Sequence, residues 1–80
     1  MEYKLWWLPN QEFDGTEKFI NYFDSHSDAI KDIIKFFDRK GVTIPYLREW
    51  KEQDTDIIFI DYSSHLHYYA IERIDDDGSK

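Results

Sequence analysis

The chain has 80 residues, with 10 Lys and Arg against 17 Asp and Glu. The resulting net charge of −7 argues against electrostatically driven binding to nucleic acid or to an anionic lipid surface. The length suits one small domain, and an aromatic share of 19% is too high for a disordered acidic chain. Cysteine is absent, so packing must stabilise the fold without disulfides or thiolate-bound zinc.

Two strands are expected first. Residues 2–8 are rich in aromatic and apolar side chains and end at a Pro-Asn pair, which is typical of a strand closed by a turn. After an Asp-Gly turn, residues 17–23 fit either a strand or a short helix. Their Phe, Ile and Tyr side chains favour a strand, which would form a hairpin with the first one.

Residues 26–40 show the clearest helical pattern. Ser25 can cap the free amides of the first turn, and Gly41 can adopt the left-handed conformation that closes the last turn. The apolar stripe recurs at helical spacing and consists of Ile30, Ile33, Ile34 and Phe37. The sequence therefore predicts an amphipathic helix with one face against a sheet.

After Gly41 the periodicity changes to two. Residues 42–44 form a short apolar stretch before a proline, and residues 46–52 alternate as a strand does. Residues 57–60 are apolar on both faces, which suits a central strand, and residues 66–74 alternate again. The expected order is β-β-α-β-β-β.

This order predicts an α+β fold: a two-layer domain with an antiparallel sheet of about four to five strands, covered by the helix on one face and wet on the other. We expect a single domain over residues 1–74 and an acidic flexible tail over residues 75–80. The expected core comprises Leu5, Trp7, Phe19, Phe23, Ile30, Ile33, Ile34, Phe37, Trp50, Ile58, Ile60 and Ile71.

The negative charge is concentrated in residues 52–77. One base, Arg73, accompanies eight acids there, a balance of −7, whereas the rest of the chain sums to zero. If a turn near residue 64 joins the last two strands, residue 56 faces about residue 72, and most of the carboxylates converge on one end of that hairpin. The acids are Glu52, Asp54, Asp56, Asp61, Glu72, Asp75, Asp76 and Asp77.

Three interpretations of this cluster stay open. It can be a solvated face that keeps the chain soluble and blocks edge pairing. It can be a surface that offers carboxylates to a basic protein partner where that partner expects phosphates. It can also hold a divalent cation, since residues 54–56 and 75–78 supply hard oxygen ligands.

The histidines give a weak metal or catalytic alternative. Asp61, His65 and His67 can bring two imidazoles and a carboxylate together, as a transition-metal site or an oriented general base requires. Exposed polar residues beside a turn explain the same pattern. No nucleophile elbow or phosphate-binding Gly loop is present, and a chain of this length leaves little room for a deep pocket. We therefore expect no enzymatic activity, no catalytic residue, no cofactor and no bound metal.

Trp6 and Trp7 are adjacent, so a strand directs them to opposite faces. If Trp7 belongs to the core, Trp6 is left on the other face as a candidate interface residue. A basic partner or a second copy of the chain in a homodimer would cover Trp6 equally well.

In its size, its acidic cluster from Glu52 to Asp77 and its aromatic residues, the chain resembles in general character the small acidic proteins of phages and mobile elements, such as anti-CRISPR and anti-restriction proteins. The resemblance implies an inhibitor or regulator of a basic, nucleic-acid-handling protein that acts as a nucleic-acid mimic through the acidic cluster and Trp6. Direct contact with nucleic acid or membrane is not expected. We expect a cytoplasmic location, in the host cell if the chain is phage-encoded. A self-associating structural domain is the remaining alternative.

Overall fold

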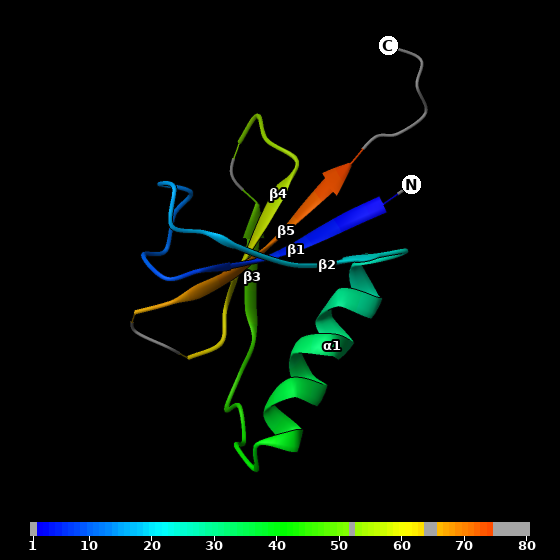
Figure 1. The fold of residues 1–80 in the computed structure, drawn as a ribbon, viewed down its shortest axis with the longest axis vertical. Coiled ribbons are helices and arrows are strands. Elements are labelled where there is room, and N and C mark those ends of the chain that lie inside the picture. The colour runs from blue at the N-terminus through cyan, green and yellow to red at the C-terminus, as the bar shows by residue number, and fades with distance from the viewer. Residues whose placement is uncertain (1, 52, 64–65, 75–80) are drawn as a thin grey trace.

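The computed structural model describes residues 2–51, 53–63 and 66–74. Five strands form one antiparallel sheet in the order β2-β1-β5-β4-β3, and a single helix packs on one face of it (Figure 1). The expected α+β class and element order are confirmed, while the acidic tail lies outside the described residues. The elements are β1 (Glu2–Leu8), β2 (Lys18–Phe23), α1 (His26–Arg39), β3 (Arg48–Lys51), β4 (Ile57–Asp61) and β5 (Tyr68–Ile74).

The helix begins and ends where its sequence predicts. The Ser25 hydroxyl accepts a hydrogen bond of 3.1 Å from the backbone N–H of Asp28, which satisfies one free amide of the first turn. At the other end, Lys40 is the C-cap and Gly41 has a φ of +71°, a conformation that favours glycine. Within the described part of the chain, no helix has the length and apolar character needed to cross a membrane.

The first and last strands of the chain are neighbours at the centre of the sheet. β1 pairs with β2 as the expected hairpin, which confirms residues 18–23 as a strand, and pairs on its other side with β5. A bulge interrupts the β1–β2 register at Leu5 and Trp6. β2 and β3 are therefore the two edges of the sheet, separated by three interior strands.

The expected register of the last hairpin is wrong by one residue. Ile57, not residue 56, lies opposite Glu72, and the backbone N–H of Arg73 donates to the carbonyl of Asp56 at 2.9 Å. Because side chains alternate between faces, this shift places Asp56 and Glu72 on opposite sides of the sheet. β4 is apolar on both faces, so its own pattern does not fix the register. β5 must also align with β1, where Leu5 lies opposite Ile71.

The core between helix and sheet matches much of the expected set. Its buried members are Leu5, Ala29, Ile33, Ile60, Tyr69 and Ile71. Two expected core residues are instead exposed: Phe19 by 45% and Ile34 by 41%. Phe19 lies on edge strand β2, whose side chains are exposed apart from the half-buried Phe23, and Ile34 lies to one side of the helical stripe.

The opposite face of the sheet is not the wet surface expected. A second cluster is buried there, formed by Leu8, Phe59 and Ala70, with Trp6 and Trp50 packed against it. Trp50 stacks on Phe59 at 5.8 Å between ring centroids. The β1–β2 loop adds Phe13, whose ring lies 5.6 Å from that of Trp6 and 6.4 Å from that of Phe59. We call this cluster the aromatic layer.

Leu8 belongs to the buried part of the aromatic layer, and its side chain is 0% exposed. Leu8→Ala should lower the free energy of unfolding by about 2–5 kcal/mol, because it removes a fully buried side chain and leaves a cavity. Leu66→Ala, at a side chain that is 68% exposed, should change it by less than about 0.5 kcal/mol. Urea denaturation of both variants measures the difference, and equal effects would show that the helix-free face has no buried core.

Candidate functional site

Acidic side chains gather at one end of the sheet. The β3–β4 turn, the start of β1 and the end of β5 lie at this end, with β5 between the other two (Figure 1). Glu2 lies opposite the last residue of β5, and Asp24 directly follows Phe23, the partner of Tyr3. The exposed carboxylates of this acidic end are Glu2, Asp24, Asp54 and Asp56.

The turn before β4 holds two of these carboxylates in water. Asp54 adopts a φ of +68°, and the hydroxyl of Thr55 accepts a 3.4 Å hydrogen bond from the backbone N–H of Ile57. The Lys51 ammonium lies 3.8 Å from the Asp56 carboxylate, but the two side chains are 58% and 60% exposed. Such an exposed pair contributes little free energy, so the turn keeps most of its negative charge available.

Glu72 and Trp6 lie elsewhere, on the aromatic layer. The indole N–H of Trp6 donates to the Glu72 carboxylate at 3.1 Å, and both side chains are half-buried. The Trp6 ring also packs edge-on against Phe13 and Phe19. The structure therefore separates Trp6 and Glu72 from Asp54 and Asp56 and gives Trp6 partners within its own chain.

Asp61 is a structural carboxylate. It is 6% exposed, and its two oxygens accept hydrogen bonds of 3.0 Å from the Arg48 guanidinium and from the backbone N–H of Ser63. Ser63 has a φ of +73°, so this second bond stabilises an unusual turn conformation. The Asp61 carboxylate thus connects β4 to edge strand β3 and to the following turn. Because it is buried, it does not belong to a surface that a partner protein could contact.

His67 also makes structural contacts. Its Nδ1 lies 3.0 Å from the Pro9 carbonyl, which can only accept, so Nδ1 carries the proton of this bond. The imidazole packs against Trp7 at 4.9 Å between ring centroids. His65 lies outside the described residues, and among those described no three His, Asp or Glu side chains are grouped as a metal site would need. Glu52, Ser64, Asp75, Asp76, Asp77 and Gly78 also lie outside the described residues.

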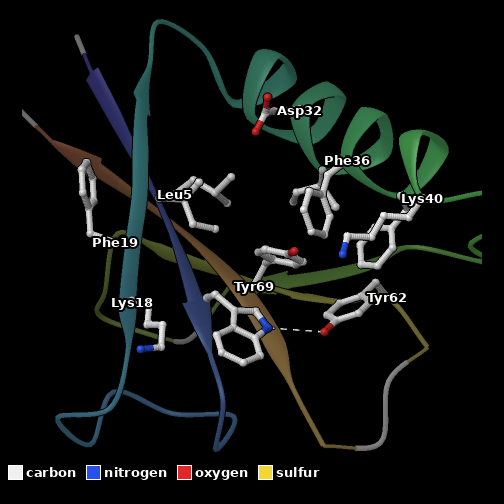
Figure 2. A pocket seen from close by; sticks show the side chains of 12 residues that line it. Leu5, Lys18, Phe19, Asp32, Phe36, Lys40, Tyr62 and Tyr69 are labelled. Carbon is white, nitrogen blue, oxygen red and sulfur yellow. Dashed lines mark hydrogen bonds between the residues drawn. The ribbon is translucent and has the colours of Figure 1, made fainter. Parts of the chain in front are cut away.

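A groove that the sequence did not predict lies between the helix and edge strand β2 (Figure 2). Its volume is about 670 Å³, within the range of ligand sites, and it is an open groove on the surface, whereas the sequence expectation concerned a deep pocket. The helix covers the central strands and leaves β2 exposed, and the space beside it remains open. Leu5, Trp7 and Tyr69 line the groove from the sheet, and Phe36 lines it from the helix.

The groove is mainly apolar, with few polar groups. The Trp7 indole N–H donates to the Tyr62 hydroxyl at 3.5 Å. Burial, with smaller contributions from Tyr62 and Asp32, raises the pKa of Tyr69 to about 12, so this hydroxyl stays neutral at physiological pH. The charged residues that line the groove are Lys18, Asp32 and Lys40. Figure 2 shows Lys18 on the β2 side and Lys40 on the helix side, with Tyr69 between them.

One sequence feature could have indicated the groove. Phe36 is a bulky apolar residue beside the helical stripe, and it is 39% exposed. Ile20 occupies a comparable place on β2 and is 40% exposed. From sequence patterns, Phe36 and Ile20 can each be assigned to one face of the helix or strand that contains it. The space between these two residues depends on how the helix crosses the sheet, which the patterns do not predict.

Comparisons with protein-family models, with curated proteins and with solved structures find no match to this chain. The residues and geometry of the acidic end and the groove are therefore the basis on which we infer function.

The structural role of Asp61 can be separated from that of an exposed carboxylate. Asp61→Ala should lower the free energy of unfolding by about 1–3 kcal/mol, because the backbone N–H of Ser63 loses its acceptor and the Arg48 pair is broken. Asp56→Ala removes an exposed pair and should cost less than about 1 kcal/mol. Chemical denaturation of both variants at neutral pH checks this, and a larger loss in Asp56→Ala would contradict the assignment.

The buried hydroxyl of Tyr69 should make the fold sensitive to alkali. Its folded pKa of about 12 lies above the ordinary value of 10.0, so its stabilising contribution is complete below about pH 10. The raised pKa of Tyr69 contributes about 2–3 kcal/mol to the free energy of unfolding, and this contribution is lost as the pH rises through 12. Tyr69→Phe should therefore lose less stability than the wild type between pH 8 and about pH 11.

Thermal or denaturant unfolding at these two pH values measures the effect. Tyr46→Phe, at a side chain that is 49% exposed, is the matched control and should follow the wild type. If Tyr69→Phe and the wild type lost the same stability on going to high pH, the buried neutral hydroxyl would not be the cause.

Proposed function

We propose that this chain is a non-enzymatic binding protein that contacts a basic, nucleic-acid-handling protein through its acidic end. One observation supports this most: four exposed carboxylates from three separate segments, Glu2, Asp24, Asp54 and Asp56, lie at one end of the sheet. The pairing of Asp56 with Lys51 is long and exposed, and it neutralises little of their charge. Glu2 and Asp24 belong to the part of the chain that is neutral in sum, so the fold adds them to the acidic cluster.

The proposed contact is electrostatic. The exposed carboxylates can meet the Lys and Arg side chains of a partner without any rearrangement of the sheet. Such a surface attracts the basic groove of the partner protein and occupies the positions in that groove where the phosphates of a nucleic acid would bind. This is the action of a nucleic-acid mimic, as in the phage inhibitors that the chain resembles, and it takes place in the cytoplasm of the cell that holds the partner.

The proposed contact residues differ from those expected from the sequence. Asp61 is excluded because its carboxylate is buried and paired, and Trp6 with Glu72 belongs to the aromatic layer on the helix-free face. Glu52 and the acids at 75–77 continue the chain from β3 and β5, the strands that end at the acidic end, and they stay predicted contacts.

A double charge reversal, Asp54→Lys with Asp56→Lys, tests the proposal. It should reduce the capture of basic host proteins by the immobilised chain by about tenfold, since two attractions become repulsions. A captured partner should be released by double-stranded DNA or by raised salt, because both compete for the same cationic groups. Quantitative binding of the purified partner at two salt concentrations gives the measurement.

The matched control is Glu12→Lys with Asp38→Lys, which changes the net charge equally at exposed positions away from the acidic end. The control should keep the wild-type affinity. If both double variants weakened binding equally, total charge and not the acidic end would be responsible; if neither did, the proposed contact surface would be wrong.

A further inference from the structure

The two edges of the sheet are protected to different degrees. β3, at one edge, has four residues, and three of them are charged: Arg48, Glu49 and Lys51. β2, at the other edge, has six residues, of which only Lys18 is charged. Short length and charged side chains discourage a further strand from pairing with an edge. β3 is therefore protected in this way, and β2 is not.

The outer side of β2 combines backbone hydrogen-bonding groups with exposed apolar side chains. β2 pairs with β1 on one side, and none of the described strands pairs with it on the other. An edge strand presents backbone N–H and C=O groups on that outer side, where a further strand can bind them. Phe19, Ile20 and Tyr22 are 45%, 40% and 50% exposed, so a strand that covers them also buries apolar surface.

The bulge between β1 and β2 gives the side chains of β2 a symmetrical order. Phe19 lies opposite Trp6 and Tyr22 lies opposite Lys4, which places both rings on the helix-free face. Without the extra residue of the bulge, positions 19 and 22 would lie on opposite faces, because side chains alternate along a strand. Phe19 is second from the start of β2, and Tyr22 is second from its end. The other residues of β2 lie on the helix side: Lys18, Ile20, Asn21 and Phe23.

This symmetry makes β2 complementary to a second copy of itself. Residues directly opposite each other in an antiparallel pair project from the same face of the sheet. When two β2 strands pair about their midpoints, Phe19 of each copy lies opposite Tyr22 of the other, on the helix-free face. Aromatic pairs of this kind stabilise neighbouring strands. The Phe19 ring already contacts Trp6 within its own chain, so the aromatic contacts continue across the interface.

The charges at the two ends of β2 are also complementary. Lys18 begins the strand, and Asp24 directly follows its last residue, Phe23. Antiparallel pairing brings the start of each β2 beside the end of the other, so Lys18 of each copy comes within reach of Asp24 of the other. Both side chains are exposed, and neither forms an ion pair with another described residue. The nearby Glu17 carboxylate accepts a 2.8 Å hydrogen bond from the backbone N–H of Gly15 in its own turn.

We propose that two copies of this chain associate through their β2 strands, as an antiparallel pair that joins the two sheets into one sheet of ten strands. The contact is symmetrical, so the same surface serves both copies. The two β3 strands become the outer edges, and their charges oppose the addition of a further copy, so that assembly stops at two. The inference goes beyond the proposed function, since Glu2, Asp54 and Asp56 of the acidic end do not lie on β2.

Sedimentation equilibrium over a dilution series measures this association. The wild type should form a particle of twice the chain mass that dissociates on dilution. Lys18→Glu brings a carboxylate beside Asp24 at both ends of the strand pair, and Asp24→Lys brings an ammonium group beside Lys18. Each variant alone should therefore weaken dimerisation by at least about tenfold, because two attractions become repulsions.

An equimolar mixture of the two variants is the decisive sample. In a mixed pair, the new carboxylate at position 18 of one chain meets the new ammonium group at position 24 of the other. The unchanged Asp24 and Lys18 meet at the second end of the strand pair. The mixture should therefore associate at least about tenfold more strongly than either variant alone. Mixing cannot repair a folding defect, so this recovery reports the contact itself.

Lys31→Glu and Asp38→Lys are the matched controls. They make the same charge changes at exposed helix positions that do not line the groove beside β2. Both controls should dimerise as the wild type does, and circular dichroism should show an unchanged helix in all four variants.

Several results would overturn the inference. A wild-type chain that stays monomeric at every concentration does so, also where β2 pairs with a strand of another protein instead. Lys18→Glu and Asp24→Lys variants that associate like the wild type would place the dimer contact elsewhere. Controls that lose association equally would assign the effect to net charge. A mixture that associates no better than its components would exclude the antiparallel pairing of β2.

Discussion

One amphipathic helix has to cover a five-stranded sheet, and this mismatch of size shapes the whole molecule. A helix with its side chains is about 10–12 Å wide, whereas neighbouring strands are about 4.8 Å apart, so a single helix covers little more than two strands. The helix packs on the interior strands through Ala29 and Ile33 and leaves edge strand β2 exposed. The groove beside β2 is a direct consequence, because the sheet extends further than its cover.

The same mismatch explains the aromatic layer. A sheet whose interior strand β4 is apolar on both faces must bury its second face, and the described residues contain no second helix to cover it. Large flat side chains from neighbouring strands do this by packing on one another, as Trp50 does on Phe59, and the β1–β2 loop adds Phe13 at the edge. Trp6 is therefore used inside its own fold, where its indole N–H also has a partner in Glu72.

Antiparallel pairing places the exposed acidic residues of several segments at one end of the sheet. Segments far apart in the sequence start or stop at the same end of the sheet, so Glu2, Asp24 and the β3–β4 turn all lie at that end. Asp61 is the last residue of β4, at the end of the sheet away from the β3–β4 turn, and it is buried with Arg48 as its partner. Whether a carboxylate of this chain is a surface charge or a structural one thus depends on the partners that the fold gives it, which for Asp61 are the Arg48 guanidinium and the backbone N–H of Ser63.

Local patterns in the sequence were enough to determine the elements. The helix from Ser25 to Gly41, the hairpin of β1 and β2, and the α+β class follow from caps, turn residues and periodicity, which act over a few neighbouring residues. Tertiary structure alone decided the register of β4 against β5, because a strand that is apolar on both faces pairs equally well in either phase until β1 aligns β5. It also decided the burial of Asp61, the layer around Trp6 and the groove between Ile20 and Phe36. Each of these depends on contacts between segments distant in the chain, and no local pattern of charge or hydropathy encodes such contacts.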